Sequence, residues 1–379
     1  MKPILLHISN DYPDPLYPDK TKAIKNLIEA TPEFRHIVYS LNRVNGLNGI
    51  AALPFGEDRT AISYTALPKG IGWKGRLEDV AHWIRRDLEQ KNIRPSIVQA
   101  HKITTEGMAG IVLAEHFNCP LICDIQSSSD LRVLKGRPDL HGHFRRIVSR
   151  SSLIFPYAPW AIHRFHSIGI TEQNSVCLPV LPGFDTLHPS TTSGSNKLVT
   201  LMRFDDRRNK NIAGTIAAIA SLQHIYPSLQ LDIYGGGGKS DFVRIMNDVQ
   251  KAGMQECIHF KGPIDNSVLP QTLGSYAALI NPSFLETYGL VFAEALFCGV
   301  PVIFTKGQAI DGYFDTTKIG YACNPASPAD IAHGIAHVLT NESTLKSGIR
   351  QMQESGALDR IRRPAIIETY RNNIRRFLA

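Results

Sequence analysis

The sequence has no apolar run that is long enough to cross a membrane. Its longest apolar region, residues 277–304, is interrupted by Glu286 and Glu294, whereas a membrane-spanning helix needs about 20 consecutive apolar residues. The apolar run at residues 3–8 is too short for a signal peptide, and we expect it to form a first strand. These features argue against a membrane-spanning helix and predict a cytoplasmic protein, either free or bound at the inner face of a membrane.

Metal-binding cysteine pairs, low-complexity tracts and short tandem repeats are also missing. The sequence has six cysteines, and Cys119 and Cys123 bracket a Pro-Leu-Ile run inside an expected strand, which is unsuitable for a tetrahedral metal site. We therefore expect free thiols in a reducing compartment.

Basic residues exceed acidic ones, with 41 Lys and Arg against 34 Asp and Glu and a net charge of +7. This balance favours acidic partners such as nucleotides, phosphorylated lipids or an anionic membrane face. Aromatic residues are sparse among the basic clusters, so we do not expect a nucleic-acid groove.

With 379 residues, the chain is too long for one ordinary core and indicates about two domains. Short apolar runs alternate with amphipathic stretches from end to end, which predicts an α/β fold with parallel sheets. Residues 178–195 are rich in Pro, Ser, Thr and Gly and are the expected domain boundary. Two halves joined there would face each other across a cleft, with ligands at the carboxyl ends of the strands.

The most informative segment is residues 281–303. Residues 277–280 are an expected strand that ends at the following Pro-Ser pair, and a helix is expected from about residue 288 to 297. Unpaired backbone N–H groups in the first turn of this helix, together with the helix dipole, can bind phosphate oxygens. The residues of this turn are Thr287, Tyr288, Gly289 and Leu290.

Two carboxylates flank that turn, Glu286 before the helix and Glu294 within it. Eight residues of helix correspond to a rise of ~12 Å, so the two carboxylates can accept hydroxyl hydrogen bonds at opposite ends of one nucleotide sugar. The alternative is a solvated Glu in a loop and a capping or surface Glu in a helix. Because Glu294 lies among apolar residues, where an idle carboxylate is costly to bury, we favour the functional interpretation.

Basic and glycine-rich loops follow the expected strands of the second half. Arg203 follows one strand and Lys210 begins the next helix, and two such cations can neutralise a diphosphate leaving group in place of a metal ion. Arg207 and Arg208 are alternatives, and an ordinary basic loop is a third interpretation. The run Gly-Gly-Gly-Gly at residues 235–238, which includes Gly235 and Gly237, permits close backbone approach to a phosphate or base, and a plain turn is equally compatible.

The pattern Asn-Pro-Ser-x-x-Glu-x-x-Gly-x-x-x-x-Glu-Ala-x-x-x-Gly-x-Pro-Val resembles the E-x7-E signature of the retaining glycosyltransferases of family 4. The resemblance is strong over residues 196–312 and weaker before them. It implies the GT-B fold, in which two Rossmann-like domains face each other across a cleft. The expected domains are an acceptor-side domain at residues 1–188, joined by a crossing C-terminal helix at 361–379, and a nucleotide-sugar-binding domain at 189–360.

The resemblance also implies roles for individual residues. It places Glu286 on the transferred sugar and Glu294 on the ribose hydroxyls, with Arg203 and Lys210 on the diphosphate. The backbone of Pro263 and Ile264 is expected to meet the base. The family retains the anomeric configuration without a bound metal, so we expect no cofactor and no metal ligands.

The first half departs from the family pattern. Residues 10–20 replace a Gly-Gly loop, and Gln126 stands where many members carry a histidine that touches the donor sugar. Glutamine can bind a sugar hydroxyl but cannot change charge near neutral pH. His101 matches a position that is often histidine, and either a structural role or a place beside the sugar or acceptor is compatible with it.

Two basic concentrations bear on the acceptor. Residues 131–166 hold seven Lys or Arg against one Asp, and residues 360–379 hold six Arg against one Glu. A solvated face is one interpretation. The other is attraction to an anionic leaflet, at about 1 kcal/mol per basic residue, which would suit a lipid-linked acceptor.

The sequence therefore predicts transfer of a hexose or N-acetylhexosamine from a nucleoside diphosphate sugar to a glycan or lipid-linked saccharide acceptor. Two alternatives remain open at this point. One is a catalytically silent subunit that binds a nucleotide sugar, and the other is an epimerase or phosphorylase on the same two-domain frame.

Overall fold

The computed structural model describes residues 2–45, 49–67, 72–126, 128–190 and 194–378. The chain forms two compact units. The first comprises Met1–Tyr157, Ala161–Leu181 and Ile366–Ala379, and the second comprises Ala158–Trp160 and Pro182–Ala365. Each unit contains one sheet that is mostly or wholly parallel, so the predicted α/β class is confirmed.

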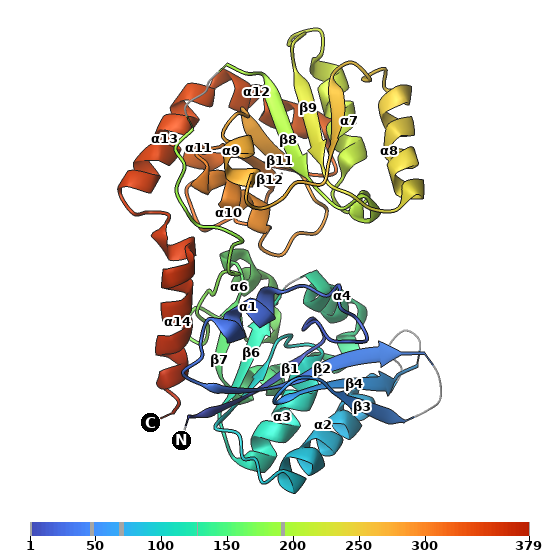
Figure 1. The fold of residues 1–379 in the computed structure, drawn as a ribbon, viewed down its shortest axis with the longest axis vertical. Helices are drawn as coiled ribbons and strands as arrows, with labels where there is room; N and C mark the ends of the chain where they lie inside the picture. The colour runs from blue at the N-terminus through green and yellow to red at the C-terminus, as the bar shows by residue number, and fades with distance from the viewer. Residues whose placement is uncertain (1, 46–48, 68–71, 127, 191–193, 379) are drawn as a thin grey trace. The chain divides into compact units, whose positions relative to one another are not determined.

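The first unit is built on a seven-stranded sheet of order β3-β4-β2-β1-β5-β6-β7 (Figure 1). All neighbours pair in parallel except β3 with β4. Helices α2 and α3 pack against each other on this sheet. The strands are β1 Ile4–Ser9, β2 Arg35–Val44, β3 Ile50–Pro54, β4 Arg59–Thr65, β5 Ile97–Ala100, β6 Leu121–Ile125 and β7 Ser151–Pro156. The helices are α1 Ala23–Glu29, α2 Trp73–Gln90, α3 Glu106–Phe117, α4 Ser128–Gly136 and α5 His141–Arg150, together with most of α6 Pro159–Phe165 and of α14 Arg363–Arg375.

The sequence patterns had not indicated β3, β4 or α2. Strand β3 is an edge strand whose residues are nearly all exposed, so it lacks the alternation that marks a half-buried strand. Helix α2 does carry a helical signal, because its buried residues recur at intervals of three and four. These residues are Leu77, Val80, Ala81, Ile84 and Leu88.

The second unit is built on a six-stranded parallel sheet of order β10-β9-β8-β11-β12-β13 (Figure 1). Helices α7 and α12 pack together beside it. The strands are β8 Lys197–Leu201, β9 Gln230–Tyr234, β10 Ile258–Gly262, β11 Ala278–Asn281, β12 Val302–Thr305 and β13 Gly320–Cys323. The helices are α7 Ile212–Leu222, α8 Lys239–Lys251, α9 Leu269–Leu273, α10 Leu290–Phe297, α11 Thr316–Ile319, α12 Pro328–Thr340 and α13 Glu342–Glu354.

The units divide at residue 181, whereas the expected boundary was residue 188. Hydrogen bonds explain the difference, since the chain beyond Pro182 is held by the second unit. The Gly183 N–H donates to the Glu294 carboxylate at 3.0 Å, and the His188 N–H donates to the Phe297 carbonyl at 2.7 Å. Residues 191–193 of the expected linker lie outside the described residues.

The C-terminal return to the first unit begins at residue 366, compared with the expected 361. Arg362 and Arg363 still belong to the second unit, because they bond to the carbonyl and carboxylate of Asp185 at 3.0 Å. Beyond them, Ile366 and Tyr370 of α14 join the buried core of the first unit.

Two further expectations concern thiols and membrane helices. All six cysteines are free, as predicted, and all but Cys177 are buried. In the described part of the chain, no helix combines the length and apolar character that a membrane span needs.

Candidate functional site

The order in which the chain adds strands to the sheet of the second unit reverses between β8 and β11. From β8 the chain builds outward through β9 to β10, and from β11 it builds the other way through β12 to β13. A crevice forms at such a switch point outside the carboxyl ends of the two strands, where open α/β sheets bind ligands. The loops that leave β8 and β11 are the ones that carry Arg203 and Glu286.

Asn281, the last residue of β11, joins the two strand ends at the switch point. Its side-chain oxygen accepts a hydrogen bond from the Thr200 hydroxyl at 2.8 Å, and its amide donates to the Leu201 carbonyl at 3.1 Å. Because Asn281 and Thr200 are buried, these bonds fix the relative register of the two loops that follow.

Lys210 and Glu286, two of the predicted site residues, lie side by side. The Lys210 Nζ lies 2.5 Å from Glu286 Oε2, and both side chains are more than four-fifths buried. The neighbouring backbone supports this pair, because Asn209 bonds to Phe284 N–H at 2.8 Å and to the Leu285 carbonyl at 3.0 Å. The loop after β8 and the loop after β11 thus form one structural unit around an ammonium–carboxylate pair.

Arg203 follows β8 directly and is largely exposed. Its guanidinium makes two hydrogen bonds to the Asp205 carboxylate, at 3.1 and 3.0 Å, with 71% of the side chain accessible. An exposed pair of this kind contributes little to stability, so the guanidinium can exchange Asp205 for a ligand at small cost. The alternative residue Arg207 is instead half-buried and bonded to Asp241 of α8 at 3.1 Å.

Helix α10 begins at Leu290, two residues later than the expected start at Tyr288. Gly289 precedes the helix at φ +69°, a left-handed conformation that lies outside the α-helical range, and a Cβ at this position would lie 2.5 Å from the Phe292 ring. Tyr288 is buried and packs edge-on against Tyr313 instead of entering the first turn.

The N–H groups expected to bind phosphate differ in their availability. The Thr287 N–H already donates to Glu286 Oε1 at 3.2 Å. Among the described residues, the N–H groups of Tyr288, Gly289 and Leu290 have no hydrogen-bond partner. These three remain able to bind an anion at the start of the helix.

Glu294 is a buried carboxylate, and only one of its two oxygens has a hydrogen-bond partner among the described residues. Its Oε1 accepts the Gly183 N–H at 3.0 Å, and Oε2 has no partner within the described residues. Only 7% of the residue is exposed, and burial raises the pKa of the carboxyl group to about 7. A carboxylate that is held at one oxygen and open at the other is suited to accepting hydroxyl hydrogen bonds.

Gly183 and Asn266 also belong to this part of the site, and the sequence patterns did not single them out. A Cβ on Gly183 would approach Glu294 Oε1 to 3.0 Å and Asn266 Nδ2 to 3.2 Å. The three residues therefore lie in contact, although 111 positions separate Gly183 from Glu294. Only the position of Gly183 in the Pro- and Gly-rich stretch before β8 hinted at a special role.

Close packing against neighbouring backbone explains why glycines follow β9. A Cβ on Gly235 would lie 1.8 Å from the Met202 carbonyl oxygen, so only glycine fits beside the end of β8. Gly237 approaches Phe204 in the same way. Pro263 and Ile264 follow β10 in the adjacent loop, where Pro263 is exposed and packs near Gly236. Contacts of these residues with a nucleotide stay a prediction.

His101 of the first unit lies within a buried polar chain. Its Nδ1 lies 2.6 Å from Asp124 Oδ2, and its Nε2 lies 3.0 Å from His7 Nδ1. His7 Nε2 continues the chain to His36 Nδ1 at 2.8 Å, and His36 Nε2 reaches the Thr31 carbonyl at 2.8 Å. His101 has no exposed surface, so in this conformation it cannot contact a sugar or acceptor, and the structural alternative holds.

Burial lowers the pKa of His7 and of His36, because a charged imidazolium loses its hydration in this interior. The Thr31 hydroxyl also lies 3.2 Å from His36 Nε2, so either group can supply the proton of that contact.

Gln126 and residues 10–20 are also anchored within the first unit. The Gln126 amide donates to the Tyr157 hydroxyl at 3.2 Å, and Gln126 keeps partial exposure. In the first loop, Asp14 accepts hydrogen bonds from Lys20 at 2.8 Å and Asn42 at 2.9 Å. This first loop is thus ordered around a buried carboxylate.

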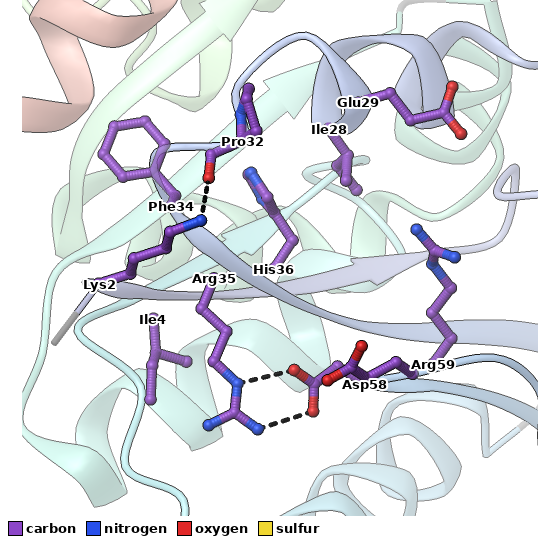
Figure 2. Close-up of a pocket in the computed structure, with 11 residues that line it drawn as sticks. Lys2, Ile4, Ile28, Glu29, Pro32, Phe34, Arg35, His36, Asp58 and Arg59 are labelled. Carbon is purple, nitrogen blue, oxygen red and sulfur yellow. Dashed lines mark hydrogen bonds and ion pairs between the residues drawn. The ribbon is translucent and has the colours of Figure 1, made fainter.

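A cavity of about 550 Å³ in the first unit is lined by charged residues of both signs (Figure 2). Arg35 donates two hydrogen bonds to Asp58 there, and Lys2 donates to the Pro32 carbonyl. The cavity lies where β1, β2 and β4 begin. Ligands of open parallel sheets bind at the opposite, carboxyl ends, and none of the predicted site residues lines this cavity.

The basic concentrations are partly neutralised. Arg137 pairs with Asp139 at 2.6 Å and Arg146 with Glu115 at 2.8 Å. The C-terminal arginines divide between the two units at residue 366 and do not belong to one body.

Comparison with known proteins gives a family match in the second unit. Residues 184–355, less than half of the chain, match the model of the family described as glycosyl transferases group 1. Among curated proteins, the glycogen synthase of Mycobacterium tuberculosis (strain CDC 1551 / Oshkosh) is 25% identical over 145 residues, covering 38% of this chain and 34% of that protein. The GtfA subunit of the UDP-N-acetylglucosamine–peptide N-acetylglucosaminyltransferase of Streptococcus gordonii is 35% identical over 111 residues, which are 29% of this chain and 20% of that one. The chain thus spans about a third or less of the length of these curated relatives.

Solved structures match over the whole chain. The sucrose-phosphate synthase of Thermosynechococcus elongatus has a TM-score of 0.73 at 18% identity and covers 99% of both chains. Anabaena HepE in complex with UDP and glucose has a TM-score of 0.66 at 15% identity, again over 99% of both chains. Likeness at these identities shows the fold, and the predicted GT-B fold is confirmed.

Proposed function

We propose that this chain is a retaining glycosyltransferase of family 4. In this proposal it moves a hexose or N-acetylhexosamine from a nucleoside diphosphate sugar to a glycan or lipid-linked saccharide acceptor, without a metal ion. The observation that carries the proposal is the set of groups at the β8–β11 switch point. A buried Lys210–Glu286 pair and the half-satisfied carboxylate of Glu294 lie in the segment that matches the family model.

The donor would bind along the loop and helix that follow β11. Its ribose hydroxyls would donate to Glu294, whose Oε2 has no partner among the described residues. Its diphosphate would bind Lys210, Arg203 and the unpaired N–H groups at the start of α10. The sugar would contact Glu286, and the base would lie over Pro263 and Ile264.

The chemistry follows from where charge develops. The bond between the sugar's anomeric carbon and the diphosphate oxygen breaks, and the acceptor oxygen forms its bond on the same face. The acceptor's proton passes to the departing phosphate oxygen. Lys210 and Arg203 stabilise the negative charge that builds on the diphosphate, which is the contribution a metal ion makes in other enzymes.

The Glu286 carboxylate also acts on Lys210 directly. It holds the ammonium of Lys210 at 2.5 Å in a mostly buried setting, where an unpaired charge would be costly. When a diphosphate arrives, the ammonium can turn toward it while the carboxylate is released to a sugar hydroxyl. Pairing thus holds both groups in position until the donor binds.

Donor, acceptor and cellular setting are further parts of the proposal. The GtfA of pneumococcus and HepE of Anabaena were solved with UDP and a sugar, so UDP-hexoses and UDP-N-acetylhexosamines are the first donors to test. We assign donor binding to the second unit and the acceptor to the first. The excess of basic residues supports a cytoplasmic protein that meets an anionic membrane surface.

The test begins with a thermal-shift screen of UDP, GDP, ADP and their sugars. Stabilisation grows with ligand concentration over Kd, so the true nucleotide should stand out. Transfer from the selected labelled donor is then measured across saccharide and lipid-linked acceptors, with Glu286→Gln as the matched inactive variant. Transfer that persists in EDTA supports the proposal. A sugar converted without any acceptor indicates an epimerase, and binding with no turnover indicates a silent subunit; either result rejects the proposed function.

A further inference from the structure

The loop that carries Glu286 is braced by a turn that follows the next strand. Gln308 lies three residues beyond the end of β12 and clamps this loop with both ends of its amide. Its Oε1 accepts the Glu286 N–H at 2.7 Å, and its Nε2 donates to the Phe284 carbonyl at 2.9 Å. The turn is closed on itself, because the Gly307 N–H donates to the Asp311 carboxylate at 2.6 Å.

Trp160 ties the loop and the turn together from a distant part of the sequence. Its indole N–H lies 3.2 Å from the Thr287 carbonyl and 3.2 Å from the Ala309 carbonyl. The residue is 5% exposed, and it belongs with Ala158 and Pro159 to the second unit, although the chain on both sides belongs to the first. A single donor therefore serves two loops that are 127 and 149 positions away.

The turn that contacts Trp160 holds Ala309 in a strained backbone conformation. It has no exposed surface and adopts φ +55°, a left-handed conformation that residues with a Cβ rarely take. Such backbone strain persists where the surroundings over-determine it, and it is enriched at functional sites. Here it turns the Ala309 carbonyl toward Trp160, while the Ala309 N–H lies 3.4 Å from the Glu286 carbonyl.

We propose that Trp160 is a positioning residue for sugar transfer, acting with Gln308 to hold the Glu286–Thr287 backbone so that the Glu286 carboxylate faces Lys210 and the donor sugar. This inference rests on the proposed function for its catalytic consequence. Every backbone polar atom of Glu286 is bonded to the brace, its N–H to Gln308 and its carbonyl to Ala309. When a catalytic carboxylate is misplaced by about 1 Å, the rate of the catalysed reaction can fall about a hundredfold.

The brace is separate from the ribose contact, and this separation gives the proposal a distinctive signature. Glu294 is held by Gly183 and by helix α10, and neither Trp160 nor Gln308 bonds to those residues in the described structure. Loss of the brace should therefore reduce kcat more than it reduces nucleotide affinity, because the N–H groups of Tyr288, Gly289 and Leu290 follow the braced residues but make no bond to Trp160 or Gln308 in the described structure. A Trp that merely fills the core would lower stability and affect both quantities together.

The test uses Trp160→Phe, which keeps a buried aromatic ring but removes the indole N–H together with the five-membered ring that carries it. Loss of the indole donor to the Thr287 and Ala309 carbonyls should lower kcat by ~10–100-fold, with the Kd for UDP raised by less than about threefold. The matched control is Trp83→Phe, because Trp83 of α2 is half-buried, packs edge-on against Tyr39 and has no described hydrogen bond at its indole. Gln308→Met should share the kcat defect, and combining it with Trp160→Phe should add less than the product of the two effects.

Hydrogen exchange of the loop separates failure of this inference from failure of the proposed function. Mass spectrometry of the unliganded full chain should show faster exchange at residues 284–287 and 307–311 in Trp160→Phe, at unchanged rates in the rest of the second unit, and no such change in Trp83→Phe. That result supports the positioning role even if no donor is ever turned over. Unchanged loop exchange, an unchanged kcat, or equal losses in kcat and UDP affinity would each overturn it.

Discussion

Replacing Glu294 with glutamine removes a charge from a site where its protonation is finely balanced. Burial raises the pKa of this carboxyl to about 7. The ionised fraction is then about 90% at pH 8 and about 9% at pH 6, a tenfold change that corresponds to about 1.4 kcal/mol. If the ribose hydroxyls donate to the ionised form, UDP should bind the wild-type protein about tenfold more weakly at pH 6 than at pH 8.

Glutamine at this position keeps the shape and one acceptor oxygen, but it cannot ionise. Hydrogen bonds to a charged group contribute ~1.5–3 kcal/mol, so Glu294→Gln should weaken UDP binding by ~10–150-fold at pH 8. Near pH 6 the two proteins should differ much less. Titration calorimetry with UDP from pH 6 to pH 8 measures both curves, and ionisation of the nucleotide's own phosphate affects the two proteins alike.

Although Glu294→Gln should weaken UDP binding, it should raise the free energy of unfolding of the protein without nucleotide. The folded pKa lies above the ordinary value of 4.5, so the folded state holds a proton that the unfolded state releases between pH 4.5 and about pH 7. The stability contributed by this carboxyl is complete below pH 4.5 and is lost as the pH rises through about 7. At pH 8 without nucleotide, Glu294→Gln should therefore unfold at higher urea than the wild type. Parallel pH profiles for UDP affinity in the two proteins would refute the ribose role of Glu294.

Four further outcomes are expected. Lys210→Met should lower kcat by ~100–1,000-fold, as loss of one preorganised oxyanion donor does, and should leave the fold intact by circular dichroism; a loss below threefold would contradict its leaving-group role. Arg207→Ala, by contrast, should leave kcat within about threefold, because Arg207 is engaged with Asp241. Gly289→Ala should lower the unfolding free energy by at least ~1 kcal/mol, since a Cβ there meets the Phe292 ring at 2.5 Å in a left-handed backbone; wild-type stability in urea would show that this turn is not constrained. Burial lowers the pKa of His7 below 6.5, so below that pH the unfolded state binds a proton that the folded state does not bind. The free energy of unfolding in urea should therefore fall as the pH drops below 6.5, by up to ~1.4 kcal/mol per pH unit. A flat pH profile that matches that of His7→Gln would contradict this.

The sequence was sufficient for the parts of the site that are local in the chain. The strand, the Pro-Ser stop, Gly289 and the short apolar helix follow from turn chemistry and periodicity within residues 277–299. Strand–helix alternation then implies a parallel sheet, and a parallel sheet places the loops after β8 and β11 at one edge. For that reason Lys210 and Glu286 could be expected at the same edge of the sheet, whereas their ion pair was not predicted.

Long-range pairings could not be predicted in the same way. The bond from Gly183 to Glu294 and those from Trp160 to Thr287 and Ala309 join residues more than 100 positions apart. Such contacts depend on how separate elements pack, and no periodicity records them. The same limit applies to His101, because only the packed sheet shows that His7 and Asp124 occupy both of its ring nitrogens.

A crystal structure of the chain with the nucleotide that stabilises it best tests the central claim most directly. The account predicts the ribose hydroxyls within hydrogen-bond distance of the Glu294 carboxylate, and the diphosphate oxygens against Lys210, Arg203 and the N–H groups of Gly289 and Leu290. A nucleotide bound elsewhere in the molecule, or with its diphosphate turned away from Lys210 and its ribose away from Glu294, would contradict it.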